Sequence, residues 1–184
     1  MKDGAVSSLG GIECLTRTQQ LWLDAWYVKD FSPLSTLGDL TILNVYLSKG
    51  AKLPPLPQLR VLNVVNSDGD LTVLSVFPNL TSFSGHYQDL SRESALTPLR
   101  SLQQLETLNL TRSNIRDLSG LELLSKLVTI DLSMNDVSDI SPLLKNAALR
   151  LGTSVDLREN PITCDDPSVK SLLERKVEVQ PCGP

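Results

Sequence analysis

One short apolar phrase returns seven times along this chain of 184 residues. Its clearest copies are LETLNLTRSNI at residues 105–115 and LVTIDLSMNDV at residues 127–137. With its first residue counted as position 1, the phrase begins at Thr18, Leu40, Leu59, Leu80, Leu105, Leu127 and Gly152. The mean step is about 22 residues, a period at which each unit is one supersecondary element that must stack on its neighbours.

Positions 4 and 6 of each phrase are apolar and are separated by one residue, so both side chains point to the same side of a short strand. They are Leu21 and Leu23, Leu43 and Val45, Leu62 and Val64, Phe83 and Gly85, Leu108 and Leu110, Ile130 and Leu132, and Val155 and Leu157. Stacking in parallel joins these sides into one core. The pattern predicts an α/β leucine-rich-repeat solenoid. This horseshoe has a parallel sheet of short strands on the concave face and 3-10 or helical turns on the convex face.

Two of the segments that connect the strands are nearly identical. Residues 30–34 read DFSPL and residues 139–143 read DISPL. In each, we expect the serine to cap a short helical turn that the proline opens. This phrase resembles the bacterial internalin-like class of leucine-rich-repeat proteins with 22-residue repeats. The resemblance covers nearly the whole chain and implies a non-catalytic module that binds a protein on its concave face.

The sequence departs from the complete repeat at both ends of the chain. Residues 9–15 align with residues 118–124, so the chain opens halfway through a unit; either further sequence precedes it or residues 1–11 cover the open end. After the last phrase, residues 165–175 predict a helix, and Val177 and Val179 predict an edge strand. We therefore expect a solenoid of about seven repeats over residues 1–163 and a C-terminal cap over residues 164–184.

The three cysteines have different settings. Cys164 and Cys182 bracket the cap and are predicted to form a disulfide bond, which implies an oxidising compartment; the alternative is two free thiols in a cytosolic protein. Cys14 aligns with Leu123 and is expected to be a small buried residue. At position 9, Asn135 and Asn160 carry the asparagine that satisfies the turn backbone in this repeat class. Earlier units lack this asparagine, which predicts a less regular N-terminal half.

Several functional classes find no support in the sequence. The 17 Lys and Arg residues are interleaved with 21 Asp and Glu residues, so no basic stripe indicates nucleic-acid binding. His86 is the single histidine and no nucleophile motif surrounds it, so no catalytic residue is predicted. The cysteines and this histidine do not supply four spaced metal ligands, and no phosphate-binding glycine loop is present. We expect no cofactor and no metal.

Positions 3, 5 and 7 of each phrase should point outward onto the concave side. In the first four units these positions are rich in apolar and aromatic residues, and in the last three they are small and polar. Such a concentration of apolar surface is typical of interaction sites. The partner-binding residues that we predict are Trp22, Asp24, Ile42, Tyr46, Val61, Val65, His86 and Tyr87.

These observations favour a protein-binding module that is secreted, periplasmic or on the cell surface, with its signal sequence outside this chain. One alternative is a cytoplasmic regulatory subunit, such as the 22-residue-repeat proteins that steer a phosphatase. Another is the recognition domain of a larger enzyme. An intact bond between Cys164 and Cys182 would disfavour the cytoplasmic regulator.

Overall fold

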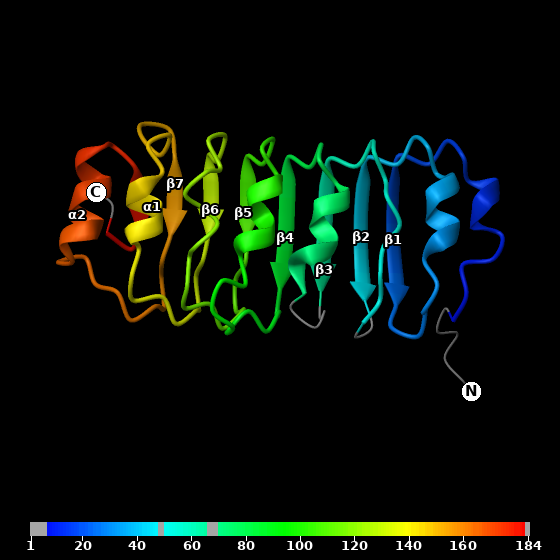
Figure 1. The fold of residues 1–184 in the computed structure, drawn as a ribbon, viewed down its shortest axis with the longest axis horizontal. Coiled ribbons are helices and arrows are strands. Elements are labelled where there is room, and N and C mark those ends of the chain that lie inside the picture. Colours follow the sequence, from blue (N-terminus) through cyan, green and yellow to red (C-terminus); the bar gives the residue numbers. More distant parts are fainter. Residues whose placement is uncertain (1–6, 48–49, 66–69, 183–184) are drawn as a thin grey trace.

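The computed structural model describes residues 7–47, 50–65 and 70–182. These residues form one sheet of eight parallel strands that lie in chain order, and Figure 1 shows them side by side along the molecule. The strands are β1 (Gln20–Ala25), β2 (Ile42–Leu47), β3 (Val61–Val65), β4 (Ser82–His86), β5 (Thr107–Asn109), β6 (Thr129–Asp131), β7 (Ser154–Asp156) and β8 (Glu178–Gln180). This sheet confirms the predicted parallel solenoid, and β8 is the expected last strand.

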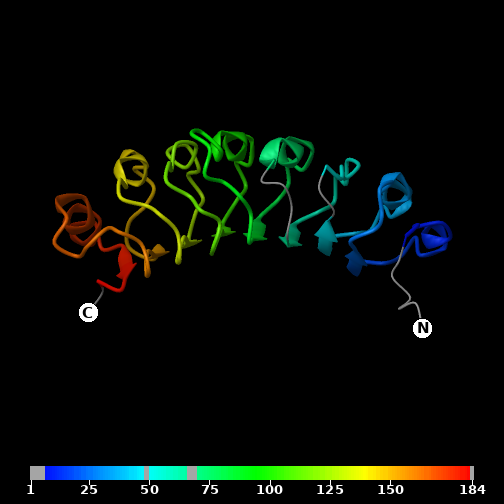
Figure 2. The ribbon, with the colours of Figure 1, turned by 90° about the horizontal axis from the view of Figure 1, so that it is seen from below.

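Short helical turns lie in most of the connections between the strands, and η1 precedes β1. Four are 3-10 helices: η1 (Ile12–Cys14), η2 (Ser32–Thr36), η3 (Leu71–Val76) and η4 (Thr97–Ser101). Two are α-helices, α1 (Ser141–Lys145) and α2 (Pro167–Glu174). Seen along the strands, the molecule is an open arc with the helical turns on the outer side and the strands on the inner side (Figure 2). The convex and concave faces are therefore arranged as the repeat predicts.

The core lies between the strands and the helical turns, where the position 4 and position 6 side chains meet. From β2 to β7 these side chains are buried, as expected. Leu21 and Leu23 are half-buried because β1 is the first strand of the sheet and has a neighbour on one side only. At Gly85 the ring of Phe83 fills the missing volume, since a Cβ there would lie 3.0 Å from it.

The predicted serine cap of the two matching turns is wrong. In η2 and α1 the serine is the first residue of the helix, and the caps, Phe31 and Ile140, make no side-chain hydrogen bond. Instead Asp30 and Asp139 accept hydrogen bonds from the backbone N–H of the serine two residues later, at 2.9 and 2.8 Å. An ionised carboxylate is the stronger acceptor for such a donor. The proline opens each turn as expected.

Asp30 belongs to a recurring device, together with Asp70 and Asp89. We call these three the turn-capping aspartates. Hydrogen bonds from the hydroxyl and then the backbone N–H of the residue two places on lower the pKa of each carboxyl below its usual range. Each of these aspartates therefore stabilises its turn in the ionised form.

The turns that follow the strands differ between the first two units and the last four. At position 8, Tyr87, Arg112, Met134 and Glu159 all adopt left-handed backbone conformations, with φ between 55° and 58°. The equivalent Ala25 and Leu47 remain in their strands. The units of Tyr87 and Arg112 form this turn with Gln88 and Ser113 at position 9, so a missing asparagine does not by itself prevent it. The first two units are irregular, as the sequence predicts, but the fourth has the regular turn.

The C-terminal segment forms the expected helix and strand. Asp166 caps α2 by accepting a hydrogen bond from the backbone N–H of Ser168 at 2.7 Å. Val177 and Val179 are buried, and β8 pairs with β7. Cys164 and Cys182 form the predicted disulfide bond, with their Cα atoms 5.3 Å apart.

The prediction for Cys14 is wrong, because its side chain is exposed. Leu123, the residue with which it aligns, is also exposed, at 58%. This position of the repeat therefore lies on the outer side of a helical turn, and an apolar residue there is no sign of burial.

Candidate binding surface

The outward residues of the sheet form three parallel rows, because adjacent strands pair without a shift. The first row runs Gln20, Ile42, Val61, Ser82, Thr107, Thr129, Ser154. The middle row runs Trp22, Asn44, Asn63, Ser84, Asn109, Asp131, Asp156. The third row runs Asp24, Tyr46, Val65, His86.

The aromatic residues are divided cleanly between core and surface. All three phenylalanines are buried, whereas both tryptophans and all three tyrosines are exposed. Trp22 is 72% exposed and Tyr46 is 42% exposed. Exposed tryptophan is costly in solution and is enriched at the centres of protein interfaces. The exposed rings of β1 and β2 therefore need an explanation other than packing.

Trp26 and Tyr27 belong to this surface but were absent from the predicted set. The Trp26 ring lies 5.5 Å from the Tyr46 ring, and Tyr27 is 67% exposed. The repeat register assigns Trp26 to position 9, where the sequence pattern indicates only that asparagine is missing. A tryptophan at a position that usually holds a small buried polar residue was the signal that could have placed Trp26 on the binding surface.

The other predicted residues occupy two separate rows. Ile42 and Val61 are neighbours in the first row, and Val65 and His86 follow Tyr46 in the third; all four are half-buried. The two apolar groups do not merge, because the polar middle row of Asn44, Asn63 and Ser84 runs between them.

Tyr87 stands apart from the other predicted residues. It follows β4 in a left-handed turn, and the guanidinium of Arg112 lies 5.8 Å from the centre of its ring. Arg112 also donates a hydrogen bond to the Tyr87 hydroxyl at 3.3 Å. The electron-rich face of this ring is therefore already occupied by a cation of the chain itself.

Trp22 interrupts the polar middle row at its first place. Asn63 donates to the side-chain oxygen of Asn44 at 2.6 Å, whereas the buried amide nitrogen of Asn44 has no hydrogen-bond partner among the described residues. The register places Trp22 beside Asn44. A polar side chain at position 22 could complete the row, so the exposed indole is not there to stabilise the sheet.

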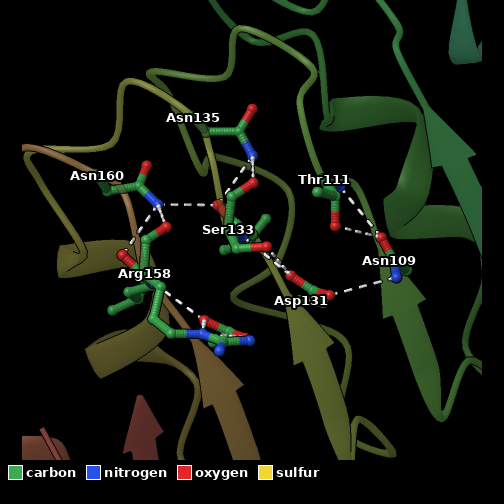
Figure 3. Close-up of polar contacts among 10 residues, drawn as sticks. Asn109, Thr111, Asp131, Ser133, Asn135, Arg158 and Asn160 are labelled. Carbon is green, nitrogen blue, oxygen red and sulfur yellow. Dashed lines mark hydrogen bonds and ion pairs between the residues drawn. The ribbon is translucent and has the colours of Figure 1, made fainter. Parts of the chain in front are cut away.

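The polar residues of the C-terminal half are bonded to one another (Figure 3). Asn109 accepts hydrogen bonds from the backbone N–H and hydroxyl of Thr111, and Asp131 does the same for Ser133. Asn109 also donates to Asp131 at 3.3 Å. These side chains hold the turns after β5 and β6, which leaves little of their hydrogen-bonding capacity for a ligand.

Asp156 and Arg158 continue this pattern at β7. The Arg158 Nε donates to Asp156 at 3.0 Å, and the two side chains form an ion pair (Figure 3). Burial raises the pKa of Asp156, but the hydrogen bonds and the positive charge of Arg158 outweigh it, so that the pKa is lowered overall. Asp131 and Asp156, the two acids of the middle row, are thus both bonded to side chains of the chain itself.

A serine–histidine pair lies on the outward face of β4. Ser84 Oγ and His86 Nε2 lie 2.7 Å apart, but among the described residues no carboxylate bonds to the imidazole ring. A serine–histidine pair needs such a third group, or an equivalent, to orient its base. Residues 7–47, 50–65 and 70–182 also contain no group of three potential metal ligands and no helix that is long and apolar enough to cross a membrane.

Solved structures match this architecture. The crystal structure of the internalin InlF from Listeria monocytogenes is 23% identical over 95% of this chain and 52% of its own, with a TM-score of 0.67. The chain has an internalin-like leucine-rich-repeat fold. The crystal structure of internalin C2 from the same organism agrees, with 23% identity over 96% of this chain and 77% of its own and a TM-score of 0.66.

The internalin-like fold confirms the resemblance that the repeat phrases indicated. This chain spans about half the length of the InlF chain. No protein-family model matches the sequence, and no curated protein matches it.

Proposed function

We propose that this chain is a non-catalytic module that binds a protein ligand on the concave face of its first four units. Trp22, Trp26 and Tyr46 form the centre of the contact, with Ile42 and Val61 on one side and Val65 and His86 on the other. The main support for the proposal is the exposed Trp22, which is the first residue of the otherwise polar middle row. Large aromatic residues supply most of the binding free energy at protein interfaces when they become buried.

The contrast between the two halves of the sheet supports this placement. Positions 5 and 7 include the exposed rings of Trp22 in β1 and Tyr46 in β2, whereas in the units of β5, β6 and β7 they hold polar side chains that bond to one another. A scaffold alone would permit the polar arrangement throughout. The N-terminal units therefore have a surface that stability does not require.

We further propose that the protein works outside the reducing cytosol, as a secreted or surface-associated bacterial protein. The disulfide bond between Cys164 and Cys182 supports this location, since such bonds persist in oxidising compartments. The internalin-like fold agrees with it. The bond disfavours a cytoplasmic phosphatase regulator.

Affinity capture with the intact chain tests the proposed surface. The immobilised protein is compared with a Trp22→Ala/Tyr46→Ala variant and with a control, Thr107→Ala/Thr129→Ala, that alters the same face in the C-terminal half. We expect the first variant to weaken binding of the captured protein by about 100-fold, as for the loss of two interface anchors. Circular dichroism checks that both variants stay folded.

The opposite pattern would overturn the proposal. If the Thr107/Thr129 variant loses the ligand while the Trp22/Tyr46 variant retains full affinity, the ligand lies on the C-terminal half.

A further inference from the structure

Asp24 is the single acidic residue among the outward positions of β1 to β4, and none of these positions holds Lys or Arg. It is exposed, and it forms no ion pair within residues 7–47, 50–65 and 70–182. By contrast, Asp131 and Asp156 on the same face are bonded to neighbouring side chains. Within these described ranges the exposed carboxylate of Asp24 has no cationic partner, so it can meet a positive charge on a ligand.

Three aromatic residues are neighbours of Asp24 in the chain or across the sheet. Tyr46 is the residue directly opposite Asp24 in the pairing of β1 with β2. Trp22 lies two residues earlier on the same face of β1, and Trp26, in the turn just after β1, packs against Tyr46 with the ring centres 5.5 Å apart. Residues opposite one another on paired strands and residues two apart on one strand are near neighbours.

The combination selects one kind of ligand group. The faces of tryptophan and tyrosine rings attract cations, and a neighbouring carboxylate adds a charge of the required sign. At Tyr87 the chain itself places Arg112 over the ring, whereas among the described residues no Lys or Arg lies over Trp22, Trp26 or Tyr46. Within the described part of the chain, this second aromatic site therefore has no cation over its rings.

We propose that Trp22, Asp24, Trp26 and Tyr46 form a subsite for an arginine side chain of the protein ligand. This inference rests on the proposed function, since it names the group that the concave face recognises. Arginine fits better than lysine because its planar guanidinium can stack on a ring and donate two parallel hydrogen bonds to the Asp24 carboxylate.

The chain carries its own reporter for a test. Trp22 and Trp26 are its two tryptophans, so the intrinsic tryptophan fluorescence comes from this subsite alone. Short extended peptides are titrated at low ionic strength, with the sequence Ser-Val-X-Val-Ser and X as arginine, citrulline or glutamate. Citrulline has almost the shape of arginine but no charge.

We expect the arginine peptide to bind about tenfold more tightly than the citrulline peptide, and the glutamate peptide to leave the fluorescence unchanged. Asp24→Asn should remove most of that preference, whereas Asp39→Asn, an exposed acid outside the outward rows, should retain it. Added salt should reduce the preference because the subsite is exposed.

Two results would overturn the inference. One is that the arginine and citrulline peptides change the fluorescence of the native chain equally, or that neither peptide changes it. The other is that Asp24→Asn keeps the full arginine preference. The subsite can fail while the proposed function stands. A ligand that needs Trp22 and Tyr46 but binds Asp24→Asn with native affinity refutes the subsite alone.

Discussion

Asn135 offers the sharpest test of how the C-terminal turns are held. The residue is 7% exposed, and its side-chain amide donates to the carbonyls of Leu110, Leu132 and Ser133 at 2.9, 2.8 and 3.1 Å. Its oxygen accepts from the backbone N–H groups of Ser113 and Ile115 at 2.9 and 3.0 Å. The side chain thus joins the turn after β5 to the turn after β6.

The cost of removing Asn135 follows from this list of partners. An amide has two hydrogens and an oxygen with two lone pairs, so the five contacts amount to about four full hydrogen bonds. Each buried backbone group left without its partner costs about 1 kcal/mol or more. We therefore expect Asn135→Ala to lower the free energy of unfolding by about 4 kcal/mol.

Asn160 is the matched control. It makes the same kinds of contact with Leu132, Leu157 and Val137, but it is only partly buried, so that water can replace the lost bonds. We expect Asn160→Ala to cost about 1–2 kcal/mol. Urea denaturation followed by circular dichroism measures both. Equal losses, or a larger loss for Asn160→Ala, would refute this account of burial.

Three further predictions concern the turns and the C-terminal end. Gly120→Ala should lower the free energy of unfolding by about 3 kcal/mol or more, because a Cβ would lie 2.4 Å from the Leu96 carbonyl oxygen. Gly152 also has a positive φ but has open space around it, so Gly152→Ala should cost about 1 kcal/mol. Equal shifts of the melting temperature in the two variants would contradict this. Reducing the bond between Cys164 and Cys182 should cost about 3 kcal/mol, measured by denaturation of Cys14→Ser with and without reductant; an unchanged midpoint would contradict it. The turn-capping aspartates have lower pKa values in the folded protein than in the unfolded chain, where the pKa is about 3.9. Their contribution to stability is therefore complete above that pH and is lost as the pH falls through the pKa values of the folded protein. The part of the unfolding free energy that these three aspartates supply should therefore stay level from about pH 7 to 5 and decline below about pH 4. Replacing all three by asparagine should reduce that decline.

The repeat made most of the fold predictable. Because side chains alternate along a strand, the spacing of Leu108 and Leu110 and of their equivalents was enough to assign the inward and outward faces. The helix and strand after residue 164 and the disulfide followed from local patterns that need no tertiary information. The asparagines at 135 and 160 marked two of the left-handed turns after the strands, whereas those at Tyr87 and Arg112 form without an asparagine at position 9.

Other features could not be predicted from a single repeat. The alignment of Cys14 with Leu123 says only that the two positions are equivalent, not that they are buried, and both are exposed. The packing of Trp26 on Tyr46 joins a turn of one unit to the strand of the next, so the register alone could not reveal it. The polar middle row likewise appears only when the strands are placed side by side.

The central claim is that the ligand contacts the N-terminal half of the concave face. A photo-crosslinking amino acid placed at Gln20, which lies beside Trp22 without replacing it, reports on that half. The same amino acid at Thr129 reports on the other, since both positions belong to the first row. The account predicts a covalent adduct with the captured protein from position 20 and little or none from position 129. Crosslinking from position 129 but not from position 20 would contradict it.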